Sequence, residues 1–456
     1  MAKYEIVDGV GIIPKGVTAI EDYAFFDYTS LTSVEIPSSV TEIGNSAFEG
    51  CSSLASIVIP ESVTKIEYGA FDGCTSLTSI VVKEGNSVFD SREGCNAIIE
   101  TATNTLIKGC NSTIIPSNVT KIGESAFQDC TSLTSIIIPE SVTKIEFGAF
   151  DGCTSLTSVV IPEGVPKIGG RTFADCTSLT SVVIPEGVTK IGGRTFSGCT
   201  SLTSVVIPKG VTAIGNFAFS GCSSLTSIAI PSSVTAIGYM TFGYCSSLTS
   251  IVIPEGVTEI GGGAFDVCTS LTSVVIPSSV TEIGKDVFSG CASLTSIIVE
   301  EGNSVYDSRE GCNAIIETVT NTLIAACKST IIPLSVTEIG HHAFSDTSLT
   351  SIEIPSSVKK IGWEVFINCT SLTTVAINGK IKRIDMGTFR GCTALESITL
   401  PAGVNKIERN AFEGCTSIKA IYVPAQKYDY YYERIPYPFN SLIVEMEPVK
   451  KAKKKK

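Results

Sequence analysis

The chain has few of the residues that build metal centres and acid–base catalysts. Among 456 residues it has one tryptophan and two histidines, which are adjacent at His341 and His342, and charged residues make up 17%. A zinc site or a histidine-based catalyst needs several convergent side chains, so an isolated histidine pair argues against both. The net charge of −12 argues against a nucleic-acid partner, because such binding needs a basic surface.

Long hydrophobic segments are also missing. The first ten residues, MAKYEIVDGV, contain Glu5 and Asp8 and have no apolar run of the length found in secretory signals. No run of about 18 apolar residues is present, so we expect no membrane span. From these features we expect a cytoplasmic protein. The one strong charge run is KKAKKKK at 450–456, and we interpret 448–456 as a disordered Lys-rich tail rather than a contact for an anionic surface.

Motifs for catalysis and cofactor binding are absent from the sequence. It contains no nucleophile elbow, no phosphate-binding loop and no paired-carboxylate motif. We interpret the glycines at 261–263 as turn glycines rather than a phosphate loop, because similar glycines recur along the chain. The acidic loops DSREG at 90–94 and 307–311 lack the spacing of an EF-hand, so we interpret them as polar turns rather than calcium sites. We therefore predict no enzyme activity, no cofactor and no metal site.

The sequence is dominated by a repeat of 23 residues. Residues 176–198 and 199–221 are identical at 18 of 23 positions. A period of this length is typical of solenoids. A proline marks one position of most repeats, and Lys83, Glu300 and Asn378 take its place in three others, which predicts about 18 turns. The prolines are Pro14, Pro37, Pro60, Pro116, Pro139, Pro162, Pro185, Pro208, Pro231, Pro254, Pro277, Pro333, Pro355, Pro401 and Pro424.

Each repeat contains three groups of apolar residues. The first, Leu-x-x-Val-x-Ile, alternates as a strand does and ends at a residue such as Pro185, which has no N–H to donate. A second apolar pair ends at Ile191, and after two glycines we expect a short helical turn that ends near Phe196. No group can form a core alone, so the repeats must stack on one another, with like side chains over like. We expect mainly β structure with little α-helix.

The consensus LTSIxIPxSVTxIGxxAFxGC, present as CSSLASIVIPESVTKIEYGAF at 51–71, resembles the signature of the BspA-type leucine-rich repeat family. The resemblance extends from about Pro14 to Pro424. It implies a right-handed leucine-rich repeat solenoid. It also implies a bacterial protein that is exposed on the cell surface or secreted, the alternative to a cytoplasmic location, and that adheres to a protein ligand on a host or bacterial surface.

Two segments interrupt the repeat, at 84–116 and 301–333. They match at 28 of 33 positions, and each adds ten residues to one repeat. The runs NAIIE and TLI flank a short polar turn, so we predict a β-hairpin in each insert, with Ile98 opposite Ile107.

The ends of a solenoid need caps, because an open end exposes core residues. We expect an N-terminal cap at 1–13, the solenoid at 14–424, and a C-terminal cap at 425–447 built from a short helix and a strand. The last segment contains a cluster of four tyrosines, which we interpret as part of the cap rather than as a binding patch.

Cysteine is frequent, with 17 residues, of which 13 share one repeat position. Thiols 23 residues apart stack in parallel and do not converge, so we predict a buried thiol ladder rather than a metal or redox array. So many unpaired thiols fit a reducing compartment. The hairpins place Cys95 opposite Cys110 and Cys312 opposite Cys327, and these two pairs are left as either thiols or disulfides.

The outward face of the first strand is the candidate binding surface. Alternate residues such as Ser181 and Val183 point outward, and a solvated sheet face normally has polar residues there. An apolar stripe beside a column of serines therefore predicts a protein-binding face; the alternative is β-propensity in a duplicated repeat. Glu35, Glu353 and Thr399 interrupt the stripe. The predicted face consists of Val58, Val81, Ile137, Val160, Val183, Val206, Val252, Val275 and Ile298 with Ser158, Ser181 and Ser204.

The charged residues also follow columns. A basic column in the middle of the chain and an acidic one later could orient a partner, but a solvated face explains both. The columns are Lys121, Lys144, Lys167 and Lys190, then Glu259, Glu282 and Glu338.

Together these features predict a monomeric, non-enzymatic scaffold that binds a protein, in an adhesin-like manner, through the concave strand face. A structural or self-assembling repeat protein inside the cell is the alternative, since near-identical repeats can stack end to end. An enzyme that uses the inserts is a further alternative, for which the sequence offers no acid–base residues.

Overall fold

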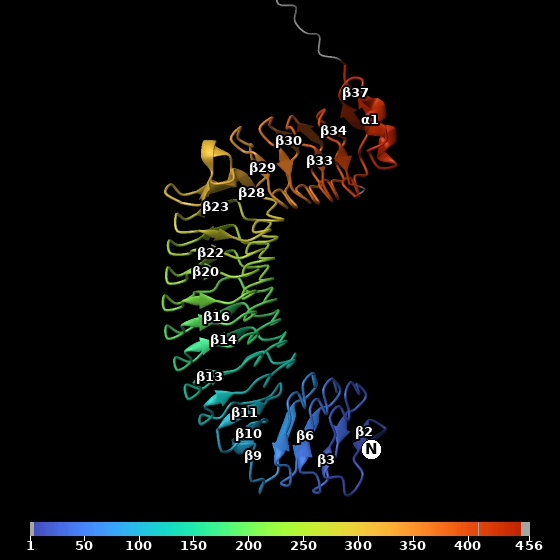
Figure 1. Cartoon of the computed structure of the whole chain (residues 1–456). Helices are drawn as coiled ribbons and strands as arrows, with labels where there is room; N and C mark the ends of the chain where they lie inside the picture. Colours follow the sequence, from blue (N-terminus) through green and yellow to red (C-terminus); the bar gives the residue numbers. More distant parts are fainter. Residues whose placement is uncertain (1–3, 409, 448–456) are drawn as a thin grey trace, which may run out of the picture. The chain divides into compact units, whose positions relative to one another are not determined.

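The computed structural model describes residues 4–408 and 410–447. The chain is a β-solenoid of about 19 turns with a spacing of about 23 residues, and about 3% of it is helical (Figure 1). This confirms the fold class predicted from the repeat. The chain divides into two compact units, Met1–Thr235 (unit 1) and Ala236–Lys456 (unit 2). The predicted Lys-rich tail at 448–456 lies outside the described residues.

Most turns of the solenoid contain a first strand of two to four residues before the proline and a second strand of two residues after it, but no first strand forms before Pro139 or Pro208. In one turn these are β16 (Ser181–Val183) and β17 (Lys190–Ile191). The register with the preceding turn is one repeat, so Val183 of β16 lies beside Val160 and Lys190 of β17 beside Lys167. Identical side chains therefore lie over one another about 4.8 Å apart, the distance between neighbouring strands.

The prediction of a short helical turn that ends near Phe196 is wrong. Residues 193–198 form consecutive hydrogen-bonded turns instead. The backbone N–H groups of Arg194 and Phe196 donate to Asn216 and Ala218 of the next repeat, at 2.9 and 2.8 Å. Because alternate amides bond to a neighbouring repeat, they are not available for the i→i−4 bonds of a helix.

In unit 1 the first strands form the sheets β1-β2-β4, β6-β8 and β14-β16, and the second strands form β3-β5-β7 and a sheet that contains β9 to β13, β15, β17 and β18. Their bounds are β1 (Glu5–Val7), β2 (Val10–Ile12), β3 (Ala19–Ile20), β4 (Ser33–Val34), β5 (Glu42–Ile43), β6 (Ser56–Ile59), β7 (Lys65–Ile66), β8 (Ser79–Val82), β9 (Phe89–Asp90), η1 (Arg92–Gly94), β10 (Ile98–Glu100), β11 (Thr105–Lys108), β12 (Lys121–Ile122), β13 (Lys144–Ile145), β14 (Ser158–Val160), β15 (Lys167–Ile168), β18 (Ala213–Ile214) and β19 (Ser227–Ala229).

In unit 2 the first strands form β21-β23-β25 and β30-β32-β34-β36-β37, and the second strands form β20-β22-β24, β26-β27-β28-β29-β31 and β33-β35. Their bounds are β20 (Ala236–Ile237), β21 (Ser250–Val252), β22 (Glu259–Ile260), β23 (Ser273–Ile276), β24 (Glu282–Ile283), β25 (Ser296–Val299), β26 (Tyr306–Asp307), η2 (Arg309–Gly311), β27 (Ala314–Glu317), β28 (Thr322–Ala326), β29 (Glu338–Ile339), β30 (Ser351–Ile354), β31 (Lys360–Ile361), β32 (Thr374–Ile377), β33 (Arg383–Ile384), β34 (Ser397–Thr399), β35 (Lys406–Ile407), β36 (Ala420–Val423), α1 (Tyr428–Tyr432), η3 (Phe439–Leu442) and β37 (Ile443–Glu445).

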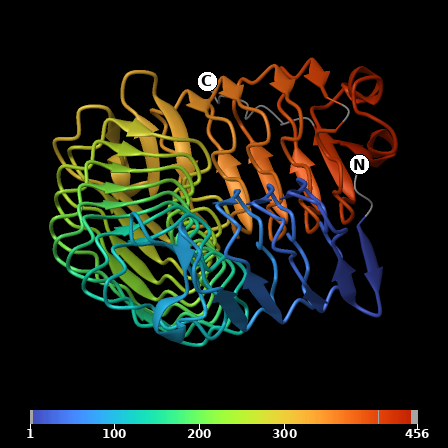
Figure 2. The ribbon, with the colours of Figure 1, turned by 90° about the horizontal axis from the view of Figure 1, so that it is seen from below.

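The core of each unit is a set of side-chain ladders. The ring of Phe173 lies 5.4 Å from that of Phe150 and 5.7 Å from that of Phe196, with the planes nearly parallel, and all three are fully buried. Columns of Leu, Ile, Val and Cys lie around them. The stacked core required by the 23-residue repeat is thus present, and each repeat buries its apolar residues against its neighbours. Figure 2 looks along the teal and green repeats of unit 1, whose turns superpose.

Both inserts form the predicted hairpins, in the predicted register next to the turn but shifted by one residue beyond a bulge. In unit 1, β10 and β11 pair antiparallel, with Ile98 opposite Lys108 and Ile99 opposite Leu106. The register changes by one between Ile98 and Ile99, so Ile98 does not lie opposite Ile107 as expected. A β-bulge adds one residue to one strand, and alternation in the sequence does not reveal it. In unit 2, β27 and β28 carry the same shift between Ile315 and Ile316.

The hairpins widen the second sheet. In unit 1, β11 pairs with β12, β10 with β11, and β9 with β10, while β7 remains at the end of its own sheet.

Both described ends of the chain have structures that differ from the repeat. At the start, β1 and β2 form an antiparallel pair, and β2 joins β4. At the end, β37 pairs in parallel with β36, and Tyr431 of α1 is fully buried with its hydroxyl donating to the Pro401 carbonyl oxygen at 2.5 Å. A buried tyrosine at this place covers the last repeat, as a cap must.

Candidate interaction surface

In unit 1, the outward residues two positions before the proline, or before the residue that replaces it, form an exposed apolar stripe. Val160 is 61% exposed, Val183 56% and Val206 79%, whereas the alternate residue Val182 is 7% exposed. Proteins bury such β-branched side chains when they can. A column of such side chains exposed to solvent gains no stability from burial in the fold, so it needs another explanation. We call the residues Val58, Val81, Ile114, Ile137, Val160, Val183 and Val206 the apolar stripe.

Unit 2 contains an equivalent, shorter column. Val252 is 74% exposed, and Val275 and Ile298 are 42% and 48% exposed. Every apolar residue predicted for the binding face thus points outward in its own unit, and Ser158, Ser181 and Ser204 are exposed beside the stripe.

Two residues of these columns were not predicted from the sequence. Ile114 and Ile331 are 76% and 73% exposed. They lie two residues before Pro116 and Pro333, at the position of Val183 relative to Pro185. They belong to the inserts, which interrupt the repeat, but the shared spacing from the proline would have identified them.

Hydroxyl groups lie along one side of the stripe. The Thr180 hydroxyl donates to the carbonyl oxygen of Thr157 in the preceding repeat at 3.0 Å, so this threonine column stabilises the stack. The Ser181 hydroxyl, by contrast, bonds to no residue in the described part of the chain. The serine column can therefore offer hydrogen bonds to a partner.

On the other side of the stripe, two neighbouring repeats carry glutamates. Glu163 and Glu186 directly follow the prolines of their repeats and are exposed. Lys209 takes this position in the next repeat. The basic column on the second strands is partly neutralised, because Lys121 and Lys144 pair with Glu146 at 2.8 and 2.6 Å. The surface next to the stripe thus favours a partner with basic residues around an apolar patch.

The cysteines are all buried free thiols. Burial raises the pKa of Cys51 to about 12 and that of Cys95 to about 11. The thiols of Cys95 and Cys110 contact the carbonyl oxygens of Ala97 and Asn96, at 3.9 and 3.3 Å. The predicted thiol ladder is confirmed, and the two hairpin pairs are thiols rather than disulfides.

The acidic loops are neutralised internally. The Arg92 guanidinium donates to both carboxylate oxygens of Asp90 and to the Asn104 side chain at 2.9 Å. Arg309 makes the same contacts with Asp307 and Asn321. Since the arginine occupies the carboxylate, these loops are polar turns. Over 4–408 and 410–447 the side chains form no cluster of three His, Cys, Asp or Glu residues suited to a metal ion.

Helices contribute little to the surface, and none in the described residues has the length and apolar character to cross a membrane. A stacked β-solenoid whose strand face displays apolar ladders belongs to the class of leucine-rich repeat scaffolds. The BspA type leucine rich repeat model matches residues 11–104, 100–222, 191–312 and 322–433, and the chain belongs to this family. The resemblance seen in the sequence is therefore confirmed.

Solved structures of bacterial proteins resemble the chain. A leucine-rich cell surface protein from Faecalibacterium prausnitzii is 31% identical over 74% of this chain and 87% of that one, with a TM-score of 0.58. A leucine-rich repeat protein from Bacteroides ovatus is 25% identical over 97% and 98%, with a TM-score of 0.49. The Treponema pallidum leucine-rich repeat protein is 29% identical over 43% and 86%, with a TM-score of 0.35. No curated protein matches.

Proposed function

We propose that this protein binds another protein, without catalysis, through the apolar stripe of unit 1. The observation that supports the proposal is the exposure of seven β-branched side chains at one repeat position, while their neighbours alternate between buried and polar. Burial of each half-exposed valine contributes about 1 kcal/mol, so several together supply the core of an interface. The free serine hydroxyls on one side and the glutamates on the other supply the polar rim.

An adhesin-like role at the cell surface is the setting that we propose. The Faecalibacterium relative is described as a cell surface protein, which favours the surface alternative over the cytoplasmic location expected from the N-terminal sequence. The ligand we propose is a host or bacterial surface protein, and the predicted monomeric state fits a ligand-binding role.

The experiment is a triple substitution, Val160→Asp, Val183→Asp and Val206→Asp, measured for binding to a panel of immobilised extracellular-matrix proteins and to whole cells. All three side chains are exposed, so circular dichroism and the thermal midpoint should change little. Binding should fall at least about a hundredfold, because three buried carboxylates would oppose the interface.

The matched control carries new charges on the second strands of the same three repeats, at Lys167, Lys190 and Ala213, all exposed. With these positions changed to Asp, binding should remain. Loss of binding in the control alone, or equal binding by the stripe variant and the wild type, would remove the stripe as the interface. Light scattering of the wild type separates a monomeric binder from a self-assembling protein.

A further inference from the structure

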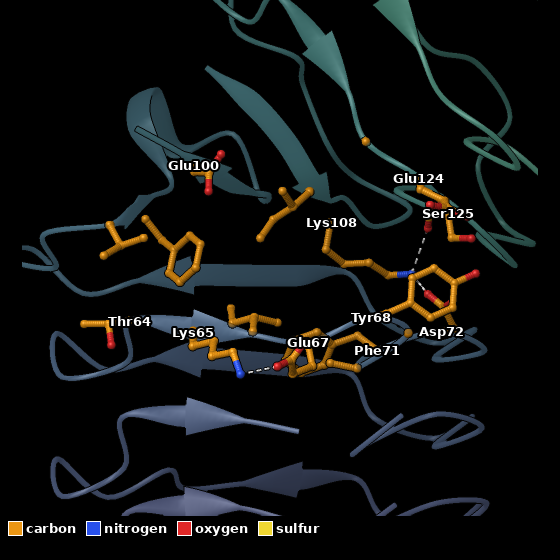
Figure 3. Close-up of a pocket in the computed structure, with 17 residues that line it drawn as sticks. Thr64, Lys65, Glu67, Tyr68, Phe71, Asp72, Glu100, Lys108, Glu124 and Ser125 are labelled. Carbon is orange, nitrogen blue, oxygen red and sulfur yellow. Dashed lines mark hydrogen bonds and ion pairs between the residues drawn. The ribbon is translucent and has the colours of Figure 1, made fainter. Parts of the chain in front are cut away.

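The first insert leaves an opening in the second sheet of unit 1. Strand β7 pairs with β5 alone, and β9 is the end strand of the neighbouring sheet. A cavity of about 290 Å³ occupies the opening. Figure 3 shows Lys65 and Glu67 on the β7 side of this cavity and Glu100 and Lys108 on the side of the insert. The site lies on the second sheet and so is separate from the apolar stripe.

Backbone groups of β7 face into the opening. The N–H groups of Lys65 and Glu67 donate to Thr41 and Ile43 of the preceding repeat, at 3.2 and 2.9 Å. Backbone groups alternate in direction along a strand, so the N–H and C=O of Ile66 point to the opposite side. In an uninterrupted solenoid the next repeat would pair with them. Here they are the free edge of a sheet.

The second insert has an equivalent opening, but there the N–H at the sheet edge already has an acceptor. A cavity of the same size, about 290 Å³, lies beside β24 and is lined by Ile283, Tyr306 and Ile324. There the N–H of Ile283 donates to the Tyr306 hydroxyl at 3.2 Å. The equivalent residue in the first insert is Phe89, which has no hydroxyl, so Ile66 lacks this acceptor.

The floor of the opening is apolar. Ile66 is partly exposed in it, whereas Ile43, its partner in the preceding repeat, is fully buried. Ile107 of β11 also lines the opening and is partly exposed. Phe89 completes the floor. An apolar side chain placed between Ile66 and Ile107 would restore the packing that the missing strand would otherwise provide.

The remaining charge on the lining is negative. The Lys108 ammonium group is buried and bonds to Asp72 at 2.8 Å and to the Ser125 carbonyl oxygen at 3.4 Å, as Figure 3 shows. Among the described residues, Glu100 and Glu124 pair with no cation. The ends of the opening therefore favour basic groups.

We propose that this opening binds an extended peptide segment of a partner protein by β-strand addition to β7. The peptide backbone accepts from the Ile66 N–H and donates to its C=O, one apolar side chain packs between Ile66 and Ile107, and flanking Lys or Arg residues approach Glu100 and Glu124. Main-chain hydrogen bonds provide the affinity in this mode and the side-chain pocket provides the selectivity. In the second insert the hydroxyl of Tyr306 occupies the equivalent backbone N–H, that of Ile283.

The test uses the full chain labelled at the isoleucine δ1 methyl groups and titrated in methyl NMR. The probes are acetylated, amidated pentapeptides Lys-X-Thr-X-Lys, with X as Val, Ile, Leu or Phe. Saturable shifts of Ile66 and Ile107, without shifts of Ile283 and Ile324, are expected. The variant Phe89→Tyr should bind the peptides about tenfold more weakly, because the new tyrosine hydroxyl accepts the hydrogen bond of the Ile66 N–H. Tyr306 shows that this side chain fits an equivalent site.

The matched variant Tyr306→Phe should open the second site, so that Ile283 and Ile324 shift as well. The same peptides with Glu at both ends should bind at least about tenfold more weakly. The absence of saturable shifts from all four peptides up to about 10 mM, or unchanged affinity in Phe89→Tyr, would overturn the proposal. The valine triple variant of the apolar stripe should keep this peptide binding, so failure at one site is distinguishable from failure at the other.

Discussion

The thiol of Cys176 donates a hydrogen bond to the carbonyl oxygen of Phe150 at 3.2 Å, and so joins its repeat to the one before. The same bond, from a cysteine to the phenylalanine 26 residues before it, recurs along the solenoid. The repeat cysteine therefore links consecutive repeats. Other examples run from Cys51 to Phe25, Cys153 to Phe127, Cys199 to Phe173, Cys291 to Phe265 and Cys392 to Phe366.

We predict that the 17 thiols are unreactive in the folded protein. Only the thiolate attacks a disulfide reagent, and burial raises the pKa of Cys51, Cys74 and Cys291 to about 12, far above a working pH of about 8. Ellman's reagent at that pH should label less than about one thiol in the native state and all 17 after denaturation. Rapid labelling of several native thiols would contradict the ladder.

The repeat makes much of the fold predictable from sequence. A proline every 23 residues positions the end of each first strand, and a phenylalanine at a constant distance positions the stacked rings, because identical repeats must adopt the same conformation. The alternation around Val183 likewise predicts which side chains point outward. These inferences need only local patterns and the repetition of one unit.

The features that the sequence did not reveal depend on contacts between different repeats. The β-bulge between Ile98 and Ile99 changes no residue pattern, and so the predicted hairpin register holds at Ile99 and Glu100 but fails by one residue at Ile98. The opening beside β7 arises because the insert strands pair with β12 instead of β7. The pairing of Lys108 with Asp72 joins residues 36 apart, a separation that is no multiple of the repeat.

The Lys108–Asp72 pair yields a prediction about stability. Both side chains are buried, with 8% and 10% exposed, and the ion pair is 2.8 Å long. Lys108→Ala leaves the Asp72 carboxylate buried without its cation, which should lower the free energy of unfolding by about 3–5 kcal/mol. Chemical denaturation of the full chain measures the change.

The second insert supplies the control for this prediction, because it contains Ala325 and Ser289 at the two equivalent positions. The double variant Lys108→Ala with Asp72→Ser copies that arrangement and removes the unpaired charge. It should recover most of the lost stability. If the double variant were as unstable as Lys108→Ala alone, packing of the lysine side chain and not its charge would be the cause.

A pH-dependent stability is expected from Asp266 in unit 2. Its pKa is raised from 3.8 to about 6, first because burial disfavours the carboxylate and then because Asp346 and Asp286 are near. The folded state therefore holds the proton more tightly than the unfolded state, so the protonated form favours folding. This contribution is present below about pH 4 and is lost as the pH rises to about 6.

The substitution Asp266→Asn isolates this effect, since asparagine resembles the protonated acid at every pH. At pH 7 the variant should be more stable than the wild type by about 1 kcal/mol, a value reduced from the full shift because the side chain is only half-buried. At pH 4 the two proteins should unfold together. Glu163→Gln, at an exposed position, should leave the pH profile unchanged. A constant difference between Asp266→Asn and wild type from pH 4 to pH 8 would show that the substitution acts through packing and not through the proton.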